Sequence, residues 1–322
     1  MEITFLGTSS GVPTRSRNVS SVALRLQQRG EVWLFDCGEG TQHQLSKSDV
    51  KASQITKIFI THMHGDHIYG LMGLIASCNL AGNRQPIEIY GPQELDNYLR
   101  SCAQYSHFKL PYGIRINEIS SGTFYEDNEF IISAKLLRHR IPAHGYCVIE
   151  KDRPGRFDVK KAVSLGIPPG PIYGELKQGK TIQLDDGRFI RGQDLCGKVE
   201  KGRKLIYCTD TIFCEEAVEL ARNADILIHE ATFAHQDSQL AFERLHSTST
   251  MAAQVALGAK AKKLILTHFS PRYAPGNNLQ LSDLLNEAKA IFPNTILAHD
   301  FMTYSIPRHI EQNKSIKLKS IS

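Results

Sequence analysis

The chain has 322 residues, a hydrophobic fraction of 41% and a formal net charge of +5, so it can bury a sizeable core as one large domain or two small ones. Its longest apolar runs are strand-sized, far short of the roughly 20 residues that a membrane-spanning helix needs, which excludes a membrane segment. The seven cysteines are dispersed without a C-x-x-C pair, which argues against a disulfide framework or a cysteine-based zinc site.

Strand signals begin at the N-terminus, where residues 3–6, 22–26 and 32–35 are rich in apolar side chains. Their close succession predicts a meander of strands. The first segment carries Glu2 and lacks the basic and apolar regions of a secretory signal. We therefore expect a cytoplasmic protein.

The run His62-Met63-His64-Gly65-Asp66-His67 follows the short apolar stretch 57–60. A regular helix would send these three imidazoles and one carboxylate to different faces, so we expect a tight loop around Gly65 that turns all four inward. Imidazole nitrogen and carboxylate oxygen are the ligands expected of zinc, with manganese and iron as alternatives. The run indicates half of a two-metal hydrolytic site, against the alternative of a polar turn with solvated histidines.

Later strand-like segments share one property, because each ends in a residue that can bind a metal or move a proton. The residues at the ends of the apolar stretches are Asp36, His62, His139, Asp210, His229 with Glu230, and His268. The loops past buried strands are where a site can be assembled. Apolar spacing of three and four residues predicts helices at 92–107, 214–223, 247–257 and 279–291. We expect mixed sheets, two of them stacked between helices.

Residues 150–204 interrupt the alternation of strand and helix signals. They hold 9 of the 24 glycines, 4 of the 13 prolines, 13 of the 38 Lys and Arg residues and 8 of the 33 Asp and Glu residues, so the whole positive excess lies here. This composition predicts an inserted arm with a polyanionic partner, and the alternative is a disordered, solvated basic loop. The run 166–171 favours a stiff, extended turn, and Tyr173 and Lys177 are suited to stacking and phosphate contact.

Taken together, the histidine run with the distant His139, Asp210 and His268 resembles the metallo-β-lactamase superfamily. Three further stretches are similar to motifs of ribonuclease Z, a family of tRNA 3′-processing endonucleases: the loop 5–18, His229-Glu230-Ala231-Thr232, and His246-Ser247-Thr248. The Gly-Pro-rich arm resembles the tRNA-binding exosite of that family. Arg15 stands where the loop motif has lysine, which keeps a cation in place. The matches span residues 3 to about 304.

The resemblance implies an α/β fold, the αββα metallo-β-lactamase sandwich of two mixed β-sheets flanked by helices. It implies a single domain at residues 1–322, with an inserted flexible, tRNA-binding arm at about 150–204. It also implies two zinc ions per subunit, with these ligands: His62, His64 and His139 on one ion, Asp66, His67 and His268 on the other, and Asp210 between them. His144 is the alternative to His139 as a metal ligand. We prefer His139 because it follows the strand-like run 130–137.

The same resemblance implies an endoribonuclease that removes the 3′ trailer from precursor tRNA, leaving a 3′-hydroxyl on the tRNA and a 5′-phosphate on the trailer. Asp66 would orient or deprotonate the attacking water, and His246, paired with Glu230, would protonate the leaving oxygen. The candidate RNA contacts are Arg15, Arg17, Arg272, Gly170 and Pro171. By resemblance the protein is a homodimer in which the arm of one subunit serves the site of the other.

Two rival interpretations remain at this stage. One is another binuclear-zinc hydrolase or phosphodiesterase of the same superfamily, acting on small substrates without the arm. The other is a non-catalytic RNA-binding protein in which the metals are structural.

Overall fold

The computed structural model describes residues 1–80, 86–110, 113–184 and 186–308. The chain forms two compact units, the first made of residues 1–149 and 204–306 and the second of residues 150–203 with residues 307 and 308. The first unit contains every predicted metal ligand. Within the described ranges, no helix has the length and apolar character needed to cross a membrane.

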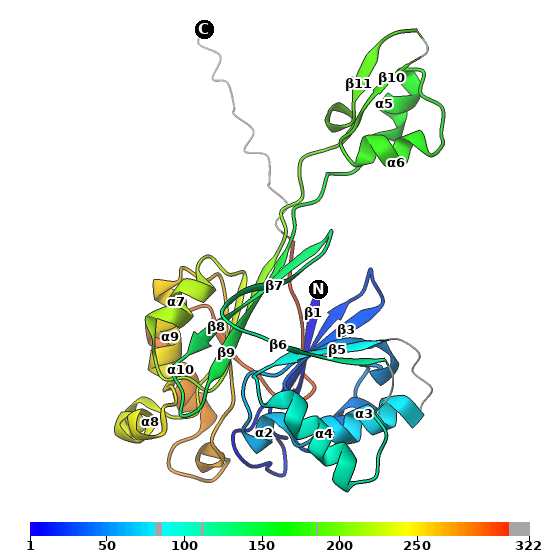
Figure 1. Ribbon diagram of the computed structural model, residues 1–322. Helices are drawn as coiled ribbons and strands as arrows, with labels where there is room; N and C mark the ends of the chain where they lie inside the picture. Colours follow the sequence, from blue (N-terminus) through cyan, green and yellow to red (C-terminus); the bar gives the residue numbers. More distant parts are fainter. Residues whose placement is uncertain (81–85, 111–112, 185, 309–322) are drawn as a thin grey trace, which may run out of the picture. The chain divides into compact units, whose positions relative to one another are not determined.

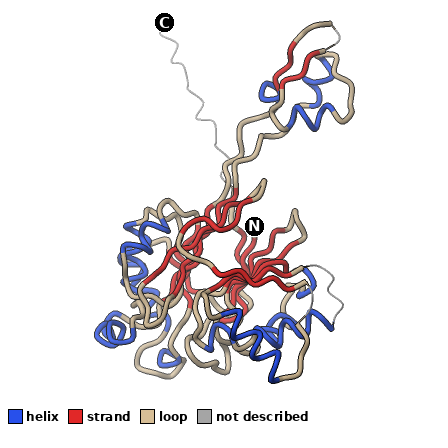
Figure 2. Tube along the Cα trace, viewed as in Figure 1, coloured by secondary structure: helices blue, strands red, loops and turns tan. Residues whose placement is uncertain are grey.

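Two sheets, each with seven strands among the described residues, form the centre of the first unit (Figures 1 and 2). The order of strands in one sheet is β16 (Thr303–Ser305), β1 (Glu2–Gly7), β2 (Ser21–Leu26), β3 (Glu31–Phe35), β4 (Ile55–Phe59), β5 (Ile87–Gly91) and β6 (Ile114–Glu118). The order in the other is β15 (Thr295–Leu297), β14 (Leu264–Thr267), β13 (Ile226–Glu230), β12 (Lys204–Cys208), β9 (Ala143–Glu150), β8 (Phe130–Leu137) and β7 (Gly122–Glu126). Both sheets are mixed, because β1 to β3 pair antiparallel and β3 to β6 parallel, while β12 to β15 pair parallel and β9 antiparallel to β12.

Helices lie on the outer faces of the two sheets, as Figure 1 shows. On the first sheet they are α1 (Thr41–Ser46), α2 (Gly65–Ile68), α3 (Leu71–Leu80) and α4 (Leu95–Tyr105). Along the second they are α7 (Glu215–Ala221), α9 (Ser249–Gly258) and α10 (Leu281–Ile291), while α8 (Ser238–Arg244) lies apart from this layer. The four helices predicted from apolar spacing correspond to α4, α7, α9 and α10, so those predictions are confirmed within a few residues at each end.

The hydrophobic core follows the alternation of side chains along the strands. Trp33 and Phe35 of β3 enter the core between the sheets, whereas Val32 and Leu34 enter the layer under α1, α3 and α4. In the same way Ile228 of β13 packs between the sheets, while its neighbour Leu227 packs under the helices on the other side. This arrangement buries both faces of each sheet, and it confirms the expected sandwich.

The second unit, which we call the arm, is more regular than its composition indicated. It contains α5 (Val159–Ser164), α6 (Ile172–Lys177), β10 (Thr181–Gln183) and β11 (Phe189–Arg191). A small core of its own holds these elements together, made of Ala162, Ile167, Leu176, Ile190 and Leu195. The arm is therefore a folded subdomain, and the alternative of a disordered loop is wrong for its described residues.

The two ends of the arm meet at one buried ion pair. Glu150, which is 2% exposed, accepts hydrogen bonds from Arg203 Nε at 2.6 Å and from Arg308 Nη2 at 2.5 Å. The backbone N–H of Glu150 also donates to the carbonyl of Arg203 at 2.8 Å. An insertion whose ends are neighbours adds little strain to the sheet that carries it.

Candidate metal centre and active site

Residues just past the strand ends form the site, and several of them have unusual backbone conformations. Asp36 follows β3, Asp210 lies two residues past β12, and His268 follows β14. All three have left-handed backbone, with φ values of 55°, 42° and 59°. This conformation is costly for residues other than glycine, and it often occurs at functional sites. The three side chains meet in the site, where Asp36 contacts His67 and Asp210 lies close to both His67 and His268.

One group of ligand atoms comes from four residues: His62, His64, His139 and Asp210. His64 Nδ1 lies 3.0 Å from His62 Nε2 and 3.2 Å from His139 Nε2. Oδ2 of Asp210 lies 3.5 Å from His62 Nε2 and 3.8 Å from His139 Nε2. The four atoms face a common centre, the arrangement that a metal requires of its ligands.

A second group forms beside the first from Asp66, His67 and His268. Oδ2 of Asp66 lies 3.4 Å from His67 Nε2 and 3.5 Å from His268 Nε2. The other oxygen of Asp210, Oδ1, lies 3.3 Å from His67 Nε2 and 3.1 Å from His268 Nε2. Asp210 thus directs one carboxylate oxygen to each group.

The buried polar atoms of this region fit a bound cation. Within the described part of the chain, His67 Nε2, His268 Nε2 and Asp210 Oδ1 are buried and make no hydrogen bond. Leaving such atoms unsatisfied is costly, and three of them at one point need a common partner. The charges of Asp210, Asp36 and Asp66 also raise the pKa of His67 above its ordinary value, although burial opposes this. The residues present therefore suit a metal ion.

The imidazoles of His67 and His139 are oriented through their second ring nitrogen. Since a carboxylate or a carbonyl oxygen can only accept, Nδ1 of His67 donates to Asp36 Oδ2 at 2.8 Å, and Nδ1 of His139 donates to the Leu245 carbonyl at 3.0 Å. Both contacts hold a proton on Nδ1 and direct Nε2 at the centre. Burial also lowers the pKa of His139 to about 4, which keeps its ring in the neutral form that binds metals.

A histidine and a glutamate lie next to the two groups. Nδ1 of His246 donates to Glu230 Oε1 at 3.0 Å, and the Glu230 side chain is fully buried. Burial alone would lower the pKa of His246, but the charge and hydrogen bond of Glu230 raise it to about 9. The ring is 17% exposed and lines the pocket, so it can present a proton to a bound molecule at neutral pH.

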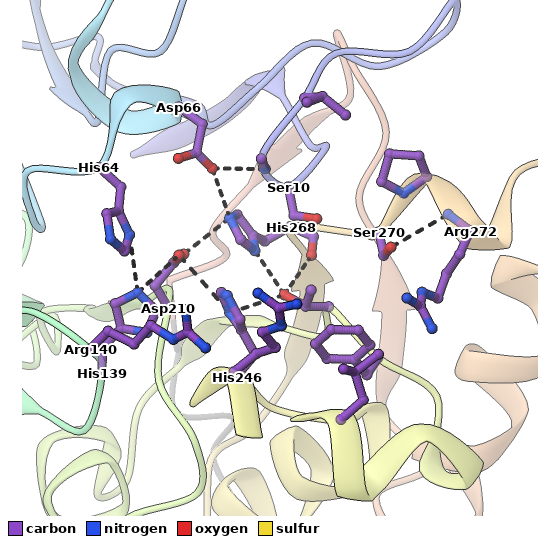
Figure 3. A pocket seen from close by; sticks show the side chains of 17 residues that line it. Ser10, His64, Asp66, His139, Arg140, Asp210, His246, His268, Ser270 and Arg272 are labelled. Carbon is purple, nitrogen blue, oxygen red and sulfur yellow. Dashed lines mark hydrogen bonds and ion pairs between the residues drawn. The ribbon is translucent and has the colours of Figure 1, made fainter. Parts of the chain in front are cut away.

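Residues of both ligand groups line an open pocket of about 440 Å³ (Figure 3): His64, Asp66, His139, Asp210 and His268. Three arginines line it: Arg140 beside His139, Arg244 at the end of α8, and Arg272. Arg272 lies over the ring of Phe233, with its Cζ 5.2 Å from the ring centroid. A pocket with imidazoles and carboxylates below and guanidinium groups around it suits a phosphate-containing substrate.

Known proteins share both the sequence and the fold of this chain. A family model described as "Beta-lactamase superfamily domain" matches residues 192–269, and one described as "Anti-Pycsar protein Apyc1" matches residues 1–105. The human tRNase Z, short form, is similar in structure, with a TM-score of 0.68 and 35% identity over 95% of this chain and 100% of that chain. A ribonuclease Z of Microcystis aeruginosa is 70% identical over 97% of this chain and 98% of its own length. A ribonuclease Z of Crocosphaera subtropica is 77% identical over 96% of this chain and 99% of its own length.

The chain belongs to the ribonuclease Z family. It is an endoribonuclease of tRNA 3′ processing, as its motifs predicted. The metallo-β-lactamase fold is confirmed as well, and the two His and Asp groups are typical of the binuclear metal site of that fold. Of the two rival interpretations, the non-catalytic RNA-binding protein is excluded by this membership.

The seven expected ligand residues come together in the two groups. The local structure of the histidine run, however, differs from the prediction. His62 and His64 lie in the loop after β4, whereas Asp66 and His67 lie on the single helical turn α2. The expectation of one loop carrying all four residues is therefore wrong. Asp66 and His67 still reach the same group from this turn, with Oδ2 and Nε2 3.4 Å apart.

The predicted substrate contacts have different surroundings. Arg17 donates to Thr8 Oγ1 at 2.6 Å and to the Ala298 carbonyl at 2.9 Å, so its guanidinium group holds the N-terminal loop in place. Arg15 is exposed, and Arg272 lines the pocket. His144 belongs to neither ligand group.

In the arm, Gly170 and Pro171 are exposed directly before α6. Pro171 has helical backbone angles, with φ −54° and ψ −29°, so the extended turn expected there ends before it. Tyr173 is half-buried against Phe157 and donates to the Ile167 carbonyl at 2.8 Å, which makes it part of the internal structure of the arm. The expectation that it stacks on RNA is not supported by this environment.

Several residues of the site were not identified from the sequence. Arg140 and Arg244 line the pocket, and Thr232 contacts both Glu230 and His268. Asp36 was noted only as the end of a strand, although it orients His67. For Arg140, Arg244 and Thr232 a signal existed, because each lies within two residues of a predicted site residue.

Proposed function

We propose that two zinc ions occupy the site, the first held by His62, His64 and His139 and the second by Asp66, His67 and His268, with Asp210 shared. The observation that carries this proposal is the position of Asp210, whose two oxygens lie within 3.1 to 3.8 Å of ligand nitrogens from both groups. Imidazole and carboxylate donors suit zinc. Bound there, the ions would neutralise charge on a phosphodiester and make a water molecule more acidic.

Asp66 would orient the attacking water. The backbone N–H of Gly11 donates to Asp66 Oδ2 at 2.8 Å and fixes the direction of the carboxylate. Burial opposes its ionisation, but the His67 and His268 rings hold the pKa of Asp66 far below its ordinary range. A carboxylate of such low basicity accepts a hydrogen bond well but removes a proton poorly. Of the two expected roles of Asp66, we therefore favour orientation.

His246 would supply the proton for the leaving oxygen. In the reaction, water oxygen bonds to phosphorus while the bond from phosphorus to the tRNA 3′ oxygen breaks, and that oxygen then needs a proton. Glu230 stabilises the charged form of His246, which lines the pocket. Transfer of this proton leaves a 3′-hydroxyl on the tRNA and a 5′-phosphate on the trailer.

The pocket arginines would bind phosphate groups of the acceptor end and the trailer. Arg140 donates to the Glu243 carbonyl at 3.1 Å, which holds it at the edge of the pocket. Arg244 and Arg272 extend the positive charge to other edges. Contacts with phosphate position the RNA without reading its sequence, and a folded RNA is recognised largely in that way.

The arm would bind the folded part of the tRNA, away from the cleavage chemistry. One support is its charge, with 13 of the 38 Lys and Arg residues between Glu150 and Lys204. A second is a hollow of about 790 Å³ within the arm, whose lining includes Arg156, Lys160 and Lys161. The exposed Gly170 and Pro171 would add backbone contacts.

We also propose that the enzyme is a homodimer. The helices on the first sheet expose large side chains near their ends, with Tyr69 65% exposed, Leu80 85% and Tyr105 81%. Such groups support a subunit interface. Light scattering after gel filtration tests the proposal: a mass of two chains is expected, and a mass of one chain at micromolar concentration contradicts it.

The proposed reaction is tested with the purified, zinc-loaded protein and a precursor tRNA that carries a 3′ trailer. Mapping both new ends should give a 3′-hydroxyl on the tRNA and a 5′-phosphate on the trailer. A 3′-phosphate on the tRNA, or cleavage that persists after zinc is removed and not replaced, would contradict the proposed mechanism.

A further inference from the structure

The hydroxyl of Thr232 lies between the proton-donor pair and the second ligand group. Thr232 is 4% exposed. Its Oγ1 lies 2.5 Å from Glu230 Oε2, 2.8 Å from His268 Nδ1 and 3.1 Å from the His268 carbonyl oxygen. His246 Nδ1 is farther away, at 3.5 Å. One side chain thus contacts both a carboxylate that binds no metal and a histidine that the proposed site needs.

The number of protons available decides the direction of these hydrogen bonds. A threonine hydroxyl has one proton to donate and two lone pairs that accept. The Glu230 carboxylate is a charged acceptor at the shortest distance, so it takes that proton in preference to the neutral His268 carbonyl. His268 Nδ1 must then donate to Oγ1, because the hydroxyl has no second proton to give. The remaining nitrogen, His268 Nε2, carries a free lone pair.

That lone pair faces the second ligand group. His268 Nε2 is buried without a hydrogen-bond partner in the described structure, 3.1 Å from Asp210 Oδ1 and 3.5 Å from Asp66 Oδ2. In the opposite tautomer a proton on Nε2 would block metal binding. We propose that Thr232 is a positioning residue that relays the charge of Glu230 to His268 and fixes the metal-binding tautomer of His268.

The relay gives Glu230 a second role. Its Oε1 accepts from His246 Nδ1 at 3.0 Å and from the backbone N–H of Thr211 at 2.7 Å, while its Oε2 accepts from Thr232. One buried carboxylate therefore sets the protonation of His246 and the tautomer of His268 together. This inference rests on the proposed two-metal site, and it concerns metal binding rather than RNA cleavage.

The experiment measures metal binding by the full chain without RNA. Metal-free protein is titrated with Co²⁺, followed by absorption, and zinc content is measured after equilibrium dialysis. We compare Thr232→Val, which removes the hydroxyl at nearly constant shape, with Thr232→Ser, which retains it. The matched control is Thr4→Val. Thr4 lies in β1, outside the site, and is also 4% exposed. Its hydroxyl lies 3.2 Å from that of Thr303.

The relay predicts that Thr232→Val weakens one of the two binding steps by roughly 10- to 100-fold, the usual effect of losing a contact behind a metal ligand. The other step should stay unchanged, because His62, His64 and His139 keep their contacts. Thr232→Ser and Thr4→Val should bind both ions as the wild type does. Equal affinity of Thr232→Val and wild type for both ions would overturn the proposal.

Glu230→Gln provides a second test if Thr232→Val fails to fold. The N–H of Thr211 keeps the amide oxygen of the new side chain at the position of Oε1, so the amide NH₂ faces Thr232. The hydroxyl then accepts from the amide and donates to His268 Nδ1, which moves the imidazole proton to Nε2. Loss of the same binding step is expected, and two unchanged steps would exclude the relay. Either result leaves the assignment of RNA cleavage untouched.

Discussion

His246 Nδ1 lies 3.0 Å from Oε1 of Glu230, a carboxylate with no exposed surface. A charged imidazole held in this way is suited to protonate a poor leaving group such as the tRNA 3′ oxygen. We expect His246→Ala to lower the single-turnover rate on precursor tRNA by roughly 10²- to 10⁴-fold. On bis(p-nitrophenyl) phosphate, whose leaving group needs no proton, the loss should be small. His235→Ala, at an exposed histidine, is the control, and equal loss on both substrates would rule out the general-acid role.

The proposed metal ligand His139 can be distinguished by substitution from the nearby His144. His139→Gln removes a nitrogen that faces the first group, so we expect one of the two bound ions to be lost and activity to fall with it. His144→Gln, five positions on, should retain both ions. Metal content after dialysis, measured by mass spectrometry, checks the pair. Two ions in His139→Gln, or one in His144→Gln, would show that the ligand set is assigned wrongly.

The arm can be removed without disturbing the sheet, because the ends of the insertion are joined by Glu150 and Arg203. We expect a short Gly-Ser linker in place of residues 151–202 to lower kcat/KM for precursor tRNA by roughly 100-fold or more, through lost phosphate contacts. Cleavage of bis(p-nitrophenyl) phosphate should remain near the wild-type rate. If cleavage of bis(p-nitrophenyl) phosphate falls as well, the arm is needed for the structure of the active site and does not act only in binding RNA.

Arg244 tests the proposed phosphate contacts in the pocket. Replacing it with glutamine should raise KM for precursor tRNA and lower the salt dependence of log KM by about 0.7 to 0.9 per lost contact. Arg115→Gln, at an exposed arginine of β6, should change neither quantity. KM measured across a range of potassium chloride concentrations distinguishes the two. An unchanged salt dependence in Arg244→Gln would place Arg244 outside the path of the RNA.

Asp127 gives the fold a predictable response to pH. Burial opposes its ionisation, but hydrogen bonds from Arg29, Tyr125 and the backbone N–H groups of residues 129 and 130 hold its pKa far below the ordinary range. A lowered folded-state pKa stabilises the protein fully above the unfolded value, near 3.9, and this contribution is lost as the pH falls further.

We therefore expect Asp127→Asn to lower the free energy of unfolding by about 1 kcal/mol at neutral pH. Urea titrations should give the same difference at about pH 5 and a smaller one at about pH 3. Asp49→Asn, at an exposed aspartate, is the control and should change little. A difference that grows as the pH falls would contradict the assigned direction of the pKa shift.

The sequence was sufficient to predict much of the site because its residues follow buried strands. His62, Asp210 and His268 each come just after an apolar stretch, and parallel neighbours such as β13 and β14 place their carboxyl ends side by side. Periodicity then located the helices that cover the sheets. Reactive residues that directly follow apolar strands can be recognised from the sequence alone.

What could not be predicted depends on contacts between distant parts of the chain. Arg17 was expected to bind RNA, but it donates to the carbonyl of Ala298, a residue 281 positions away. Arg244 lines the pocket because α8 ends beside His139, which donates to the carbonyl of Leu245, a residue 106 positions away. The arm has its own core although its composition is rich in glycine and proline, since a few well-spaced apolar residues such as Leu176 and Ile190 were enough.

The left-handed backbone at Asp36, Asp210 and His268 has a consequence for the lifetime of the protein. Such a conformation costs about 1–2 kcal/mol per residue, so the metal-free chain is destabilised at its own active site. Ligands that bind only the folded state offset that cost in proportion to their concentration. A cell short of the metal would then hold a chain that unfolds and is degraded more readily. Supply of the ion would set how much of the enzyme survives as well as how fast it works.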